Sequence, residues 1–215
     1  MLRVVSRLQY LTSFVEEMRQ SDHEATFLVK AVKGRNLNPN QYAFVLIDGR
    51  REKINEAAKD RSLEWFAEWA APIIDARSSG RKVLIPIPSS KTVKASAGDF
   101  RTAQIADAIA KRCRSAQVAP VLRWKRPIPS ASEDGGSRDQ RILYPLLTTA
   151  GAIPDGECVF IDDVLTSGGH LVASVWKLAD LGRTVKLAVC CGSTSHEQIP
   201  DPFAVPERML DVTRK

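Results

Sequence analysis

Residues 159–169 read VFIDDVLTSGG, and this stretch decides the fold that we predict. It begins with a short apolar run rich in β-branched and aromatic residues, which predicts a buried strand ending near residue 161. Two acids, Asp162 and Asp163, follow the run. Ligands bind beyond the carboxyl ends of the strands in a parallel sheet, so this strand would deliver both carboxyls to a site.

The residues after the acids have the composition of an anion-binding turn. Thr166, Ser167, Gly168 and Gly169 can direct successive backbone amides toward a bound anion. A helix predicted from residue 170 would add the positive end of its dipole. Acids that accept hydrogen bonds from vicinal hydroxyls, placed just before a phosphate cradle, describe a site for a ribose 5-phosphate. The alternative is a glycine-rich turn with surface acids.

Strands and helices alternate on both sides of this stretch. Strands are predicted at residues 83–87, 118–122, 158–161 and 185–191, and helices at residues 100–113 and 170–181. Such alternation predicts an α/β fold in which helices flank a central, mostly parallel sheet. Asp99 is expected to cap the start of the first helix, and Gly182 to supply the left-handed residue at the end of the second.

The first 80 residues carry a different pattern. Apolar positions in residues 5–18 recur at steps of three and four, which predicts a helix. Residues 27–32 and 43–47 are predicted to pair as strands across the turn between them. A further helix is predicted from residue 61 to residue 71, where Pro72 would end it.

We divide the chain into an N-terminal helical and hairpin element that forms a hood or arm (1–80), a core (81–192) and a C-terminal tail (193–215). The 215 residues are 44% hydrophobic and 26% charged, which is ordinary for a globular protein. The four cysteines form no CxxC pair, so neither a zinc site nor a disulfide framework is indicated. We predict no signal peptide, no membrane span and a cytoplasmic location.

A second polar loop follows the predicted strand at 83–87. Residues 84–91 read LIPIPSSK, and they lead through Lys94 to Arg101 and a helix. Ser89, Ser90 and Lys91 could offer hydroxyls, amides and a cation to a diphosphate, while Lys94 and Arg101 add positive charge. A solvated basic turn would have the same composition.

The longest polar stretch is residues 126–141, which read RPIPSASEDGGSRDQR. A connection of this length inside a compact α/β domain is usually either a mobile lid or a disordered loop. The composition fits both descriptions, and the glycine pair at 135–136 would supply the mobility that a lid needs.

The stretch at 159–169 resembles the sequence that type I phosphoribosyltransferases use to bind 5-phosphoribosyl 1-pyrophosphate (PRPP). It has the apolar strand, the two acids, two mostly apolar positions and then Thr, Ser and Gly. Residues 84–91 resemble the pyrophosphate loop of the competence-associated, ComF-like branch of that family. The resemblance covers about residues 81–191, and the zinc-binding head of many ComF-like chains is missing.

The resemblance implies a type I phosphoribosyltransferase fold and a role for each matching residue. Asp162 and Asp163 would be the catalytic acids that orient the ribose. The 5-phosphate would be held by Leu165, Thr166, Ser167, Gly168 and Gly169, and the pyrophosphate by Pro88, Ser89, Ser90 and Lys91. Arg138 or Arg141 would reach the leaving pyrophosphate from the lid. Mg²⁺ would be bound mainly through PRPP, with no dedicated protein site.

The implied activity is enzymatic: transfer of the phosphoribosyl group from PRPP to a nitrogenous base or amine, with release of pyrophosphate. A homodimer is also implied. The alternative is a catalytically silent sensor of PRPP or nucleotides, or a nucleic-acid-associated factor, since the formal charge of +6 favours anionic partners. Basic residues are not interleaved with aromatic ones along the sequence, as a surface that stacks bases would require.

Overall fold

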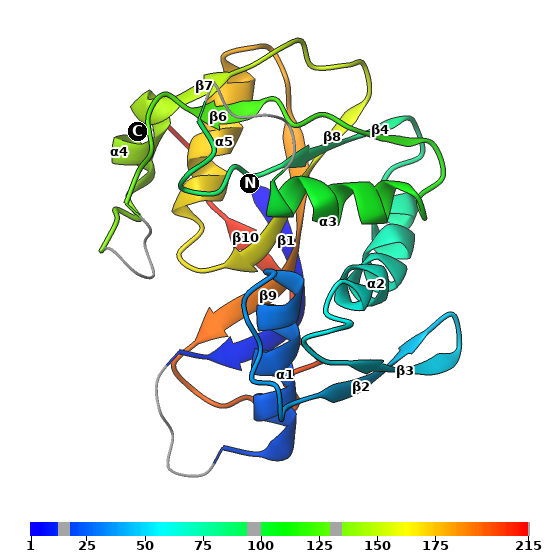
Figure 1. Cartoon of the computed structure of the whole chain (residues 1–215). Coiled ribbons are helices and arrows are strands. Elements are labelled where there is room, and N and C mark those ends of the chain that lie inside the picture. Colours follow the sequence, from blue (N-terminus) through cyan, green and yellow to red (C-terminus); the bar gives the residue numbers. More distant parts are fainter. Residues whose placement is uncertain (13–17, 94–99, 130–134, 215) are drawn as a thin grey trace.

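The computed structural model describes residues 1–12, 18–93, 100–129 and 135–214. Its centre is a six-stranded sheet in the order β10-β1-β9-β8-β4-β5. The strands are β1 (Leu2–Leu11), β4 (Lys82–Pro86), β5 (Ala116–Val118), β8 (Glu157–Leu165), β9 (Val185–Ser195) and β10 (Arg208–Leu210). Every neighbouring pair is parallel except β10 with β1. The predicted α/β fold with a mostly parallel sheet is therefore confirmed (Figure 1).

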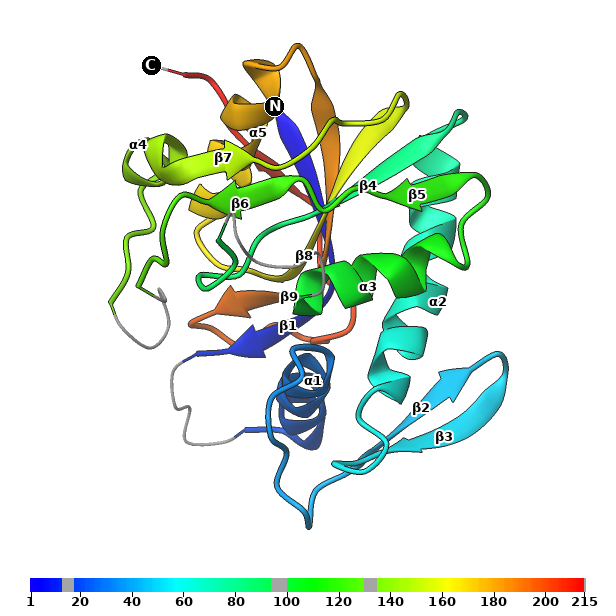
Figure 2. The same cartoon turned by 45° about the horizontal axis from the view of Figure 1, so that its top comes forward.

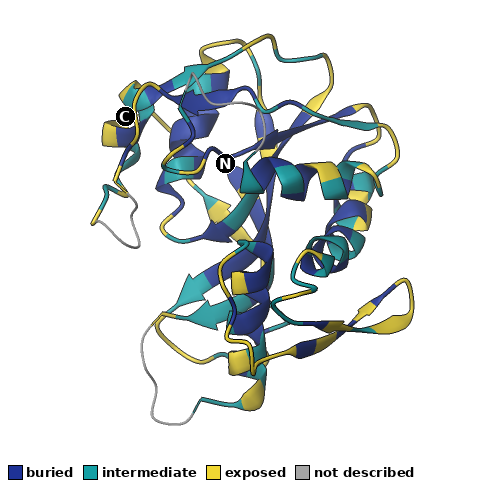
Figure 3. Ribbon diagram, in the orientation of Figure 1, coloured by how far each residue is buried: buried dark blue, intermediate teal, exposed yellow. Residues whose placement is uncertain are grey.

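Helices cover both faces of this sheet. They are α1 (Gln20–Val32), α2 (Arg61–Arg77), α3 (Arg101–Ala110), α4 (Gln140–Leu143) and α5 (Gly169–Ala179), with a 3₁₀ turn η1 (Tyr144–Leu146) after α4. The first three helices share one apolar cluster with the sheet, which includes Val29, Ile74 and Ile105. α5 shares a second cluster with the opposite face, through Leu171 and Leu178. Figure 3 shows the sheet strands between these layers as largely buried.

Two small antiparallel sheets lie outside the central one. β2 (Ala43–Ile47) pairs with β3 (Arg50–Ile54), and β6 (Leu122–Trp124) pairs with β7 (Leu147–Thr149). The β2–β3 pair lies beside α1 and α2, whereas β6 and β7 lie at the other end of the molecule, near α5 (Figure 2). The two ends of the protein thus carry separate additions to one core.

The connections of the sheet place a switch point between β4 and β8. From β4 the chain passes through α3 to β5 on one side, and from β8 it passes through α5 to β9 on the other. In open α/β sheets the crevice beyond the carboxyl ends of two such strands is where ligands bind. The loops that follow β4 and β8 are the two that the sequence had singled out.

The prediction of a helix at residues 5–18 was wrong, because residues 5–11 belong to β1, while residues 13–17 lie outside the described residues. β1 lies between β9 and β10, so both of its edges are paired, and apolar clusters cover both of its faces. Val5 and Leu8 join one apolar cluster, while Leu2 and Val4 join the other. A strand buried on both faces has no strict alternation, and its apolar residues fell at the three and four residue steps of a helix.

The predicted strand at 27–32 was also wrong, since these residues form the end of α1. The true partner of β2 is β3, and the turn between them is Asp48-Gly49, with φ of 50° and 72°. Positive φ at both central residues of a two-residue turn is the geometry that Asp-Gly favours in hairpins. The hairpin therefore forms across the Asp48-Gly49 turn and not across the longer turn that we had predicted between residues 32 and 43.

Several element boundaries differ from the predictions. α2 continues through Pro72 to Arg77, with Ile74 fully buried beyond the proline. The single strand expected at 118–122 is split into β5 and β6, and the strand expected at 185–191 continues to Ser195. Gly182 has the predicted left-handed conformation, with φ of 70°. Asp99 and Lys94 lie outside the described residues.

Candidate functional site

A cleft of about 290 Å³ opens at the switch point between β4 and β8. The lining side chains are Tyr10, Lys33, Arg35, Ile87, Pro88, Ser89, Ser90, Arg101, Thr102, Arg138, Asp162, Asp163, Val164, Thr166 and His170. Both loops predicted from the sequence therefore meet in one cavity, together with residues from the N-terminal 35. Cations and hydroxyls surround a pair of acids in this cleft, which suits a ligand with several anionic groups.

The two acids lie within the last four residues of β8 and not after its end, because the strand continues to Leu165 beside β9. Asp162 accepts a hydrogen bond from the backbone amide of Asp163 at 2.8 Å. Burial raises the pKa of the Asp162 carboxyl well above its ordinary value, and the neighbouring Asp163 carboxylate raises it further. The pair therefore resists carrying two negative charges until a cationic group arrives.

Lys33, at the end of α1, forms an ion pair with one of these acids. Its Nζ lies 3.8 Å from Oδ2 of Asp163, and both side chains are about one quarter exposed. The chain then turns at Gly34, which has φ of 69°. A side chain in the left-handed region would be strained there, so glycine allows the chain to leave the helix directly behind Lys33.

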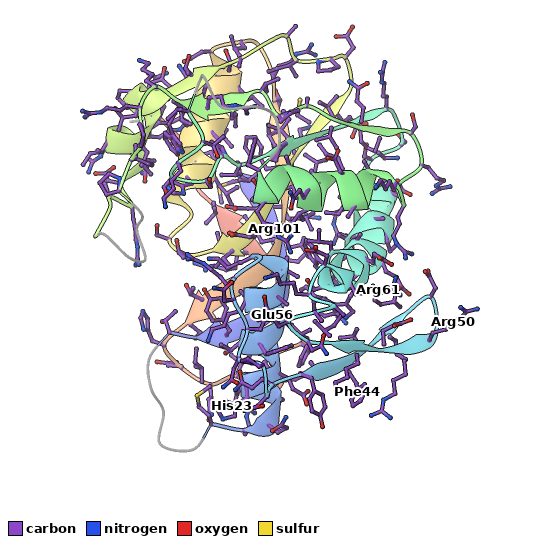
Figure 4. The ribbon with its side chains drawn as sticks, viewed as in Figure 1. His23, Phe44, Arg50, Glu56, Arg61 and Arg101 are labelled. Atoms are coloured by element: carbon purple, nitrogen blue, oxygen red, sulfur yellow. The ribbon has the colours of Figure 1, made fainter. Side chains whose placement is uncertain are left out.

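Arg101 holds this end of α1 in place. Its guanidinium donates hydrogen bonds to the carbonyl oxygens of Val32 at 2.6 Å and Ala31 at 3.0 Å, and it contacts Asp60 at 2.9 Å. Figure 4 shows Arg101 in the region where α3 approaches α1. Cationic donors near the carboxyl end of a helix satisfy carbonyls that have no partner within the helix. Arg101, which we had predicted to add charge beside a diphosphate, is thus committed to the backbone that carries Lys33.

The loop between β8 and α5 is built around two glycines, of which Gly168 lies close to a side chain and Gly169 close to a backbone carbonyl. Gly168 has φ of 86°, and a Cβ atom on it would lie 2.7 Å from Leu210 in β10. A Cβ atom on Gly169 would lie 2.0 Å from the carbonyl oxygen of Arg138. Only glycine permits approaches of this kind. The start of α5 is consequently tied to the segment that we predicted to be a lid.

The loop after β4 is fixed by β6 and by the residues that follow it. Trp124 donates from Nε1 to the carbonyl of Ser89 at 3.0 Å, and the amide of Ile128 donates to the carbonyl of Ser90 at 3.0 Å. The Trp124 ring also packs against His170 with the centroids 5.4 Å apart. Burial lowers the pKa of the His170 imidazole, which favours its neutral form. The loop is therefore held in shape next to the first turn of α5.

The structure brings most, but not all, of the predicted site residues to the cleft. Among the two predicted phosphate loops, Pro88, Ser89, Ser90 and Thr166 line it. Leu165, Gly168 and Gly169 are buried behind the lining, whereas Ser167 and Lys91 are exposed and lie outside it. Their roles stay predictions.

The predicted lid is described only in part, because residues 130–134 lie outside the described ranges. Arg138 lines the cleft. Arg141 is exposed, pairs with Asp139 at 2.7 Å and is not among the lining residues. Of the two predicted lid arginines, only Arg138 is thus placed at the cavity.

Four lining residues were not selected from the sequence: Tyr10, Lys33, Arg35 and Thr102. Lys33 and Arg35 flank a glycine in the run FLVKAVKGR, whose first six residues we had predicted to form a strand. Tyr10 could not be selected, since its segment was predicted to be helical. Thr102 donates to the carbonyl of Ile87 at 2.5 Å, and so links α3 to the loop after β4.

Comparison with known proteins finds distant structural likeness only. No protein-family model matches the sequence, and no curated protein matches it. A hypoxanthine phosphoribosyltransferase from Staphylococcus aureus aligns at 10% identity with a TM-score of 0.39, covering 66% of this chain and 70% of that one. An adenine phosphoribosyltransferase from Trypanosoma brucei, in complex with AMP, pyrophosphate and ribose-5-phosphate, aligns at 12% identity with a TM-score of 0.41, covering 91% and 90%. The interpretation of the site rests on its own geometry.

Two further features bear on ligands and environment. Within the described residues, His, Cys, Asp and Glu side chains do not gather in groups of three or more that could hold a metal ion. The adjacent carboxyls of Asp162 and Asp163 nevertheless offer oxygen atoms of the kind that Mg²⁺ prefers, with room for ligands from a substrate and from water. In the same described part of the chain, no helix is both long enough and apolar enough to cross a membrane.

Proposed function

We propose that the protein is a phosphoribosyltransferase, which binds PRPP with Mg²⁺ and transfers the phosphoribosyl group to a nitrogenous acceptor with release of pyrophosphate. The observation that carries this proposal is the meeting of an acid pair, the hydroxyl of Thr166 and a serine loop in one cleft between β4 and β8. The sequence likeness to type I phosphoribosyltransferases, and to their ComF-like branch, supports it.

Each part of the cleft fits one part of PRPP. The first turn of α5, with Thr166 beside it, suits the 5-phosphate, since a helix amino terminus attracts anions. Asp162 and Asp163 suit the vicinal hydroxyls of the ribose, and the hydroxyls of Ser89 and Ser90 suit the diphosphate. Mg²⁺, when bound through PRPP, would neutralise the diphosphate as it leaves.

Lys33 has a specific place in this proposal. It partly neutralises Asp163 in the absence of ligand, at a separation of 3.8 Å that is longer than a hydrogen bond. The charge of Lys33 opposes part of the rise in the pKa of the Asp162 carboxyl. An ionised carboxylate next to the ribose stabilises the positive charge that develops at C1 as pyrophosphate departs.

Calorimetry with PRPP and MgCl₂ tests the site without knowledge of the acceptor. We expect the intact protein to bind, and the variant Asp162→Asn/Asp163→Asn to lose about tenfold or more in affinity, since charge-assisted hydrogen bonds contribute about 1.5–3 kcal/mol each. Asp155→Asn is the matched control, because its carboxyl is 98% exposed and far from the cleft lining. No heat with the intact protein at millimolar PRPP would refute the proposal.

Pyrophosphate release separates an enzyme from a sensor. A panel of purines, pyrimidines and aromatic amines, added to protein, PRPP and MgCl₂, should include an acceptor that releases pyrophosphate. We expect that release to be absent in the double variant. Binding of PRPP without release for any member of the panel would favour the silent PRPP sensor.

A further inference from the structure

The outer face of the β2–β3 ribbon carries an unusual group of exposed apolar side chains. Seven large apolar residues are exposed among the described residues, and three of them, Tyr42, Phe44 and Leu46, follow one another at alternate positions on this ribbon. They are 52%, 48% and 64% exposed, respectively. Successive side chains of a strand point to opposite faces, so these three share one face. Apolar side chains gathered in this way indicate a binding surface.

Cations from the opposite strand lie on the same face. The register places Lys53 opposite Phe44 and Arg51 opposite Leu46. The Arg51 guanidinium lies 3.9 Å from the centre of the Phe44 ring. Lys53 Nζ lies 4.4 Å from the centre of the Tyr42 ring, and the two rings are 5.4 Å apart. Aromatic rings and cations are therefore interleaved in space although they are separated in sequence.

Glu52, the acid within the paired strands of the ribbon, is turned to the other face. Glu52 pairs in register with buried Val45 and forms an ion pair with Arg61 of α2 at 3.1 Å. Within the described ladder from residue 43 to residue 54, the outer face thus presents rings, a leucine and cations without a carboxylate. Its charge is complementary to an anionic partner.

The ribbon is fastened to the body, so this face is formed before any partner binds. At its tip, Asp48 accepts two hydrogen bonds from the Arg112 guanidinium, each at 2.8 Å. The amide of Asp48 donates to Glu68 of α2 at 2.8 Å. A preformed surface avoids the entropic cost of ordering on binding.

A groove of about 670 Å³ adjoins the rings, between β2 and the first turns of α1. Amide side chains of Gln20, Asn40 and Gln41 line it, together with His23. Glu24, the acidic residue that lines this groove, accepts a hydrogen bond from the Gln20 side chain at 3.1 Å. Figure 4 shows His23 at the end of α1 that lies beside Phe44. Amides can both donate to and accept from the edges of nucleobases, because each carries both kinds of group.

We propose that this face binds single-stranded nucleic acid. Tyr42 and Phe44 would stack on exposed bases, Arg51 and Lys53 would contact phosphates, and the amides of the groove would meet base edges. Bases must be unpaired to reach aromatic rings in this way, which is why a single strand fits better than a duplex. The proposal is independent of the cleft between β4 and β8, and it corrects our expectation that the basic and aromatic residues are not interleaved.

Fluorescence anisotropy with labelled oligo-dT and oligo-U of about 12 nucleotides tests the proposal. We expect binding that weakens from about 50 to about 200 mM salt. Tyr42→Ala/Phe44→Ala should weaken it about tenfold or more, since each stacked base contributes strongly. Arg51→Ala/Lys53→Ala should lower the slope of log affinity against log salt by roughly two.

The matched control is Lys111→Ala/Leu181→Ala, which removes an exposed cation and an exposed apolar side chain elsewhere. It should bind as the unaltered protein does, and all variants should keep its melting temperature. The proposal would be overturned by an absence of binding at low salt, by equal binding of a duplex, or by equal competition from poly-glutamate, which would indicate an acidic polypeptide partner. It would also be overturned if Tyr42→Ala/Phe44→Ala bound the oligonucleotides with unchanged affinity.

Discussion

The loop between β8 and α5 and the ribbon of β2 and β3 carry the two groups of side chains to which we assign ligands, and they are built in opposite ways. At the loop, the acids at the end of β8, the hydroxyls and the glycines lie within eight consecutive positions, 162–169. In the ribbon, rings come from β2 and cations from β3, and they meet only through the register of the two strands. One site is local in sequence, while the other exists only after the chain has paired.

The two regions also differ in how tightly they are held. Gly168 and Gly169 are in contact with Leu210 and with the backbone of Arg138, so the loop depends on segments far away in the chain. The rings of the ribbon are about half exposed and touch mainly each other and their cations. Substitutions should therefore disturb the loop through packing and the ribbon mainly through binding.

The largest effect is expected for Gly169→Ala. Its Cβ atom would lie 2.0 Å from the Arg138 carbonyl oxygen, and a backbone atom cannot move aside without moving its segment. We expect a loss of roughly 1–3 kcal/mol in the free energy of unfolding, measured by urea titration, together with weaker PRPP binding.

Gly80→Ala is the control for that substitution, because its Cβ atom would meet only Glu157 at 3.5 Å. It should change the free energy of unfolding by less than about 0.5 kcal/mol. Equal losses in the two variants would show that the close approach of Arg138 to α5 is unimportant.

The next effect is expected for Arg101→Ala, which removes the guanidinium donor of the Val32 carbonyl and one of the two donors to the Ala31 carbonyl. We expect a loss of about 2 kcal/mol in the free energy of unfolding and a weaker affinity for PRPP, because the end of α1 that carries Lys33 is released. Arg101→Lys should not restore either quantity, since lysine lacks the planar fork of donors.

Arg114→Ala serves as the matched control, as its side chain is 85% exposed. A fall in PRPP affinity for Arg101→Ala without any loss of stability would contradict the positioning role. It would instead favour the direct contact with a diphosphate that the sequence predicted.

Asp162→Asn should stabilise the protein in a pH-dependent way. The folded-state pKa of Asp162 is raised, so its stability contribution is complete below the unfolded pKa of about 4 and is lost as the pH rises through the folded value. Asparagine removes that loss. We expect a gain of roughly 1 kcal/mol at pH 8 that vanishes near pH 3, measured by thermal melting across this range. A gain that is independent of pH, or shared by Asp155→Asn, would show that the buried carboxyl is not its source.

The smallest effect on stability is expected on the ribbon. Phe44→Ala removes a half-exposed ring and one cation–π contact, which should change the free energy of unfolding by less than about 1 kcal/mol and leave PRPP binding intact. Val45→Ala, on the inner face and 7% exposed, should cost more, about 1.5–3 kcal/mol. Thermal melting measures the stability of both variants, and calorimetry measures their binding of PRPP. A larger effect at Phe44 than at Val45 would contradict our assignment of the two faces.

The sequence predicted best where neighbouring residues act together. Alternating strands and helices beyond residue 81 indicated the parallel sheet, and the acid and glycine run indicated the loop that lines the cleft. It predicted worst before residue 55. There β1 is covered on both faces, so its apolar spacing imitated a helix, and the β-branched residues of α1 imitated a strand.

By itself, the sequence determined the class of the fold and the presence of an acid pair before a turn rich in hydroxyls and glycines, because both depend on short runs of adjacent residues. The tertiary structure decided that Lys33 faces Asp163, that Arg101 donates hydrogen bonds to the carboxyl end of α1, and that rings and cations share one face of the ribbon. Those contacts join residues from different elements. Their partners are chosen by strand register and helix packing, which no local pattern of residues records.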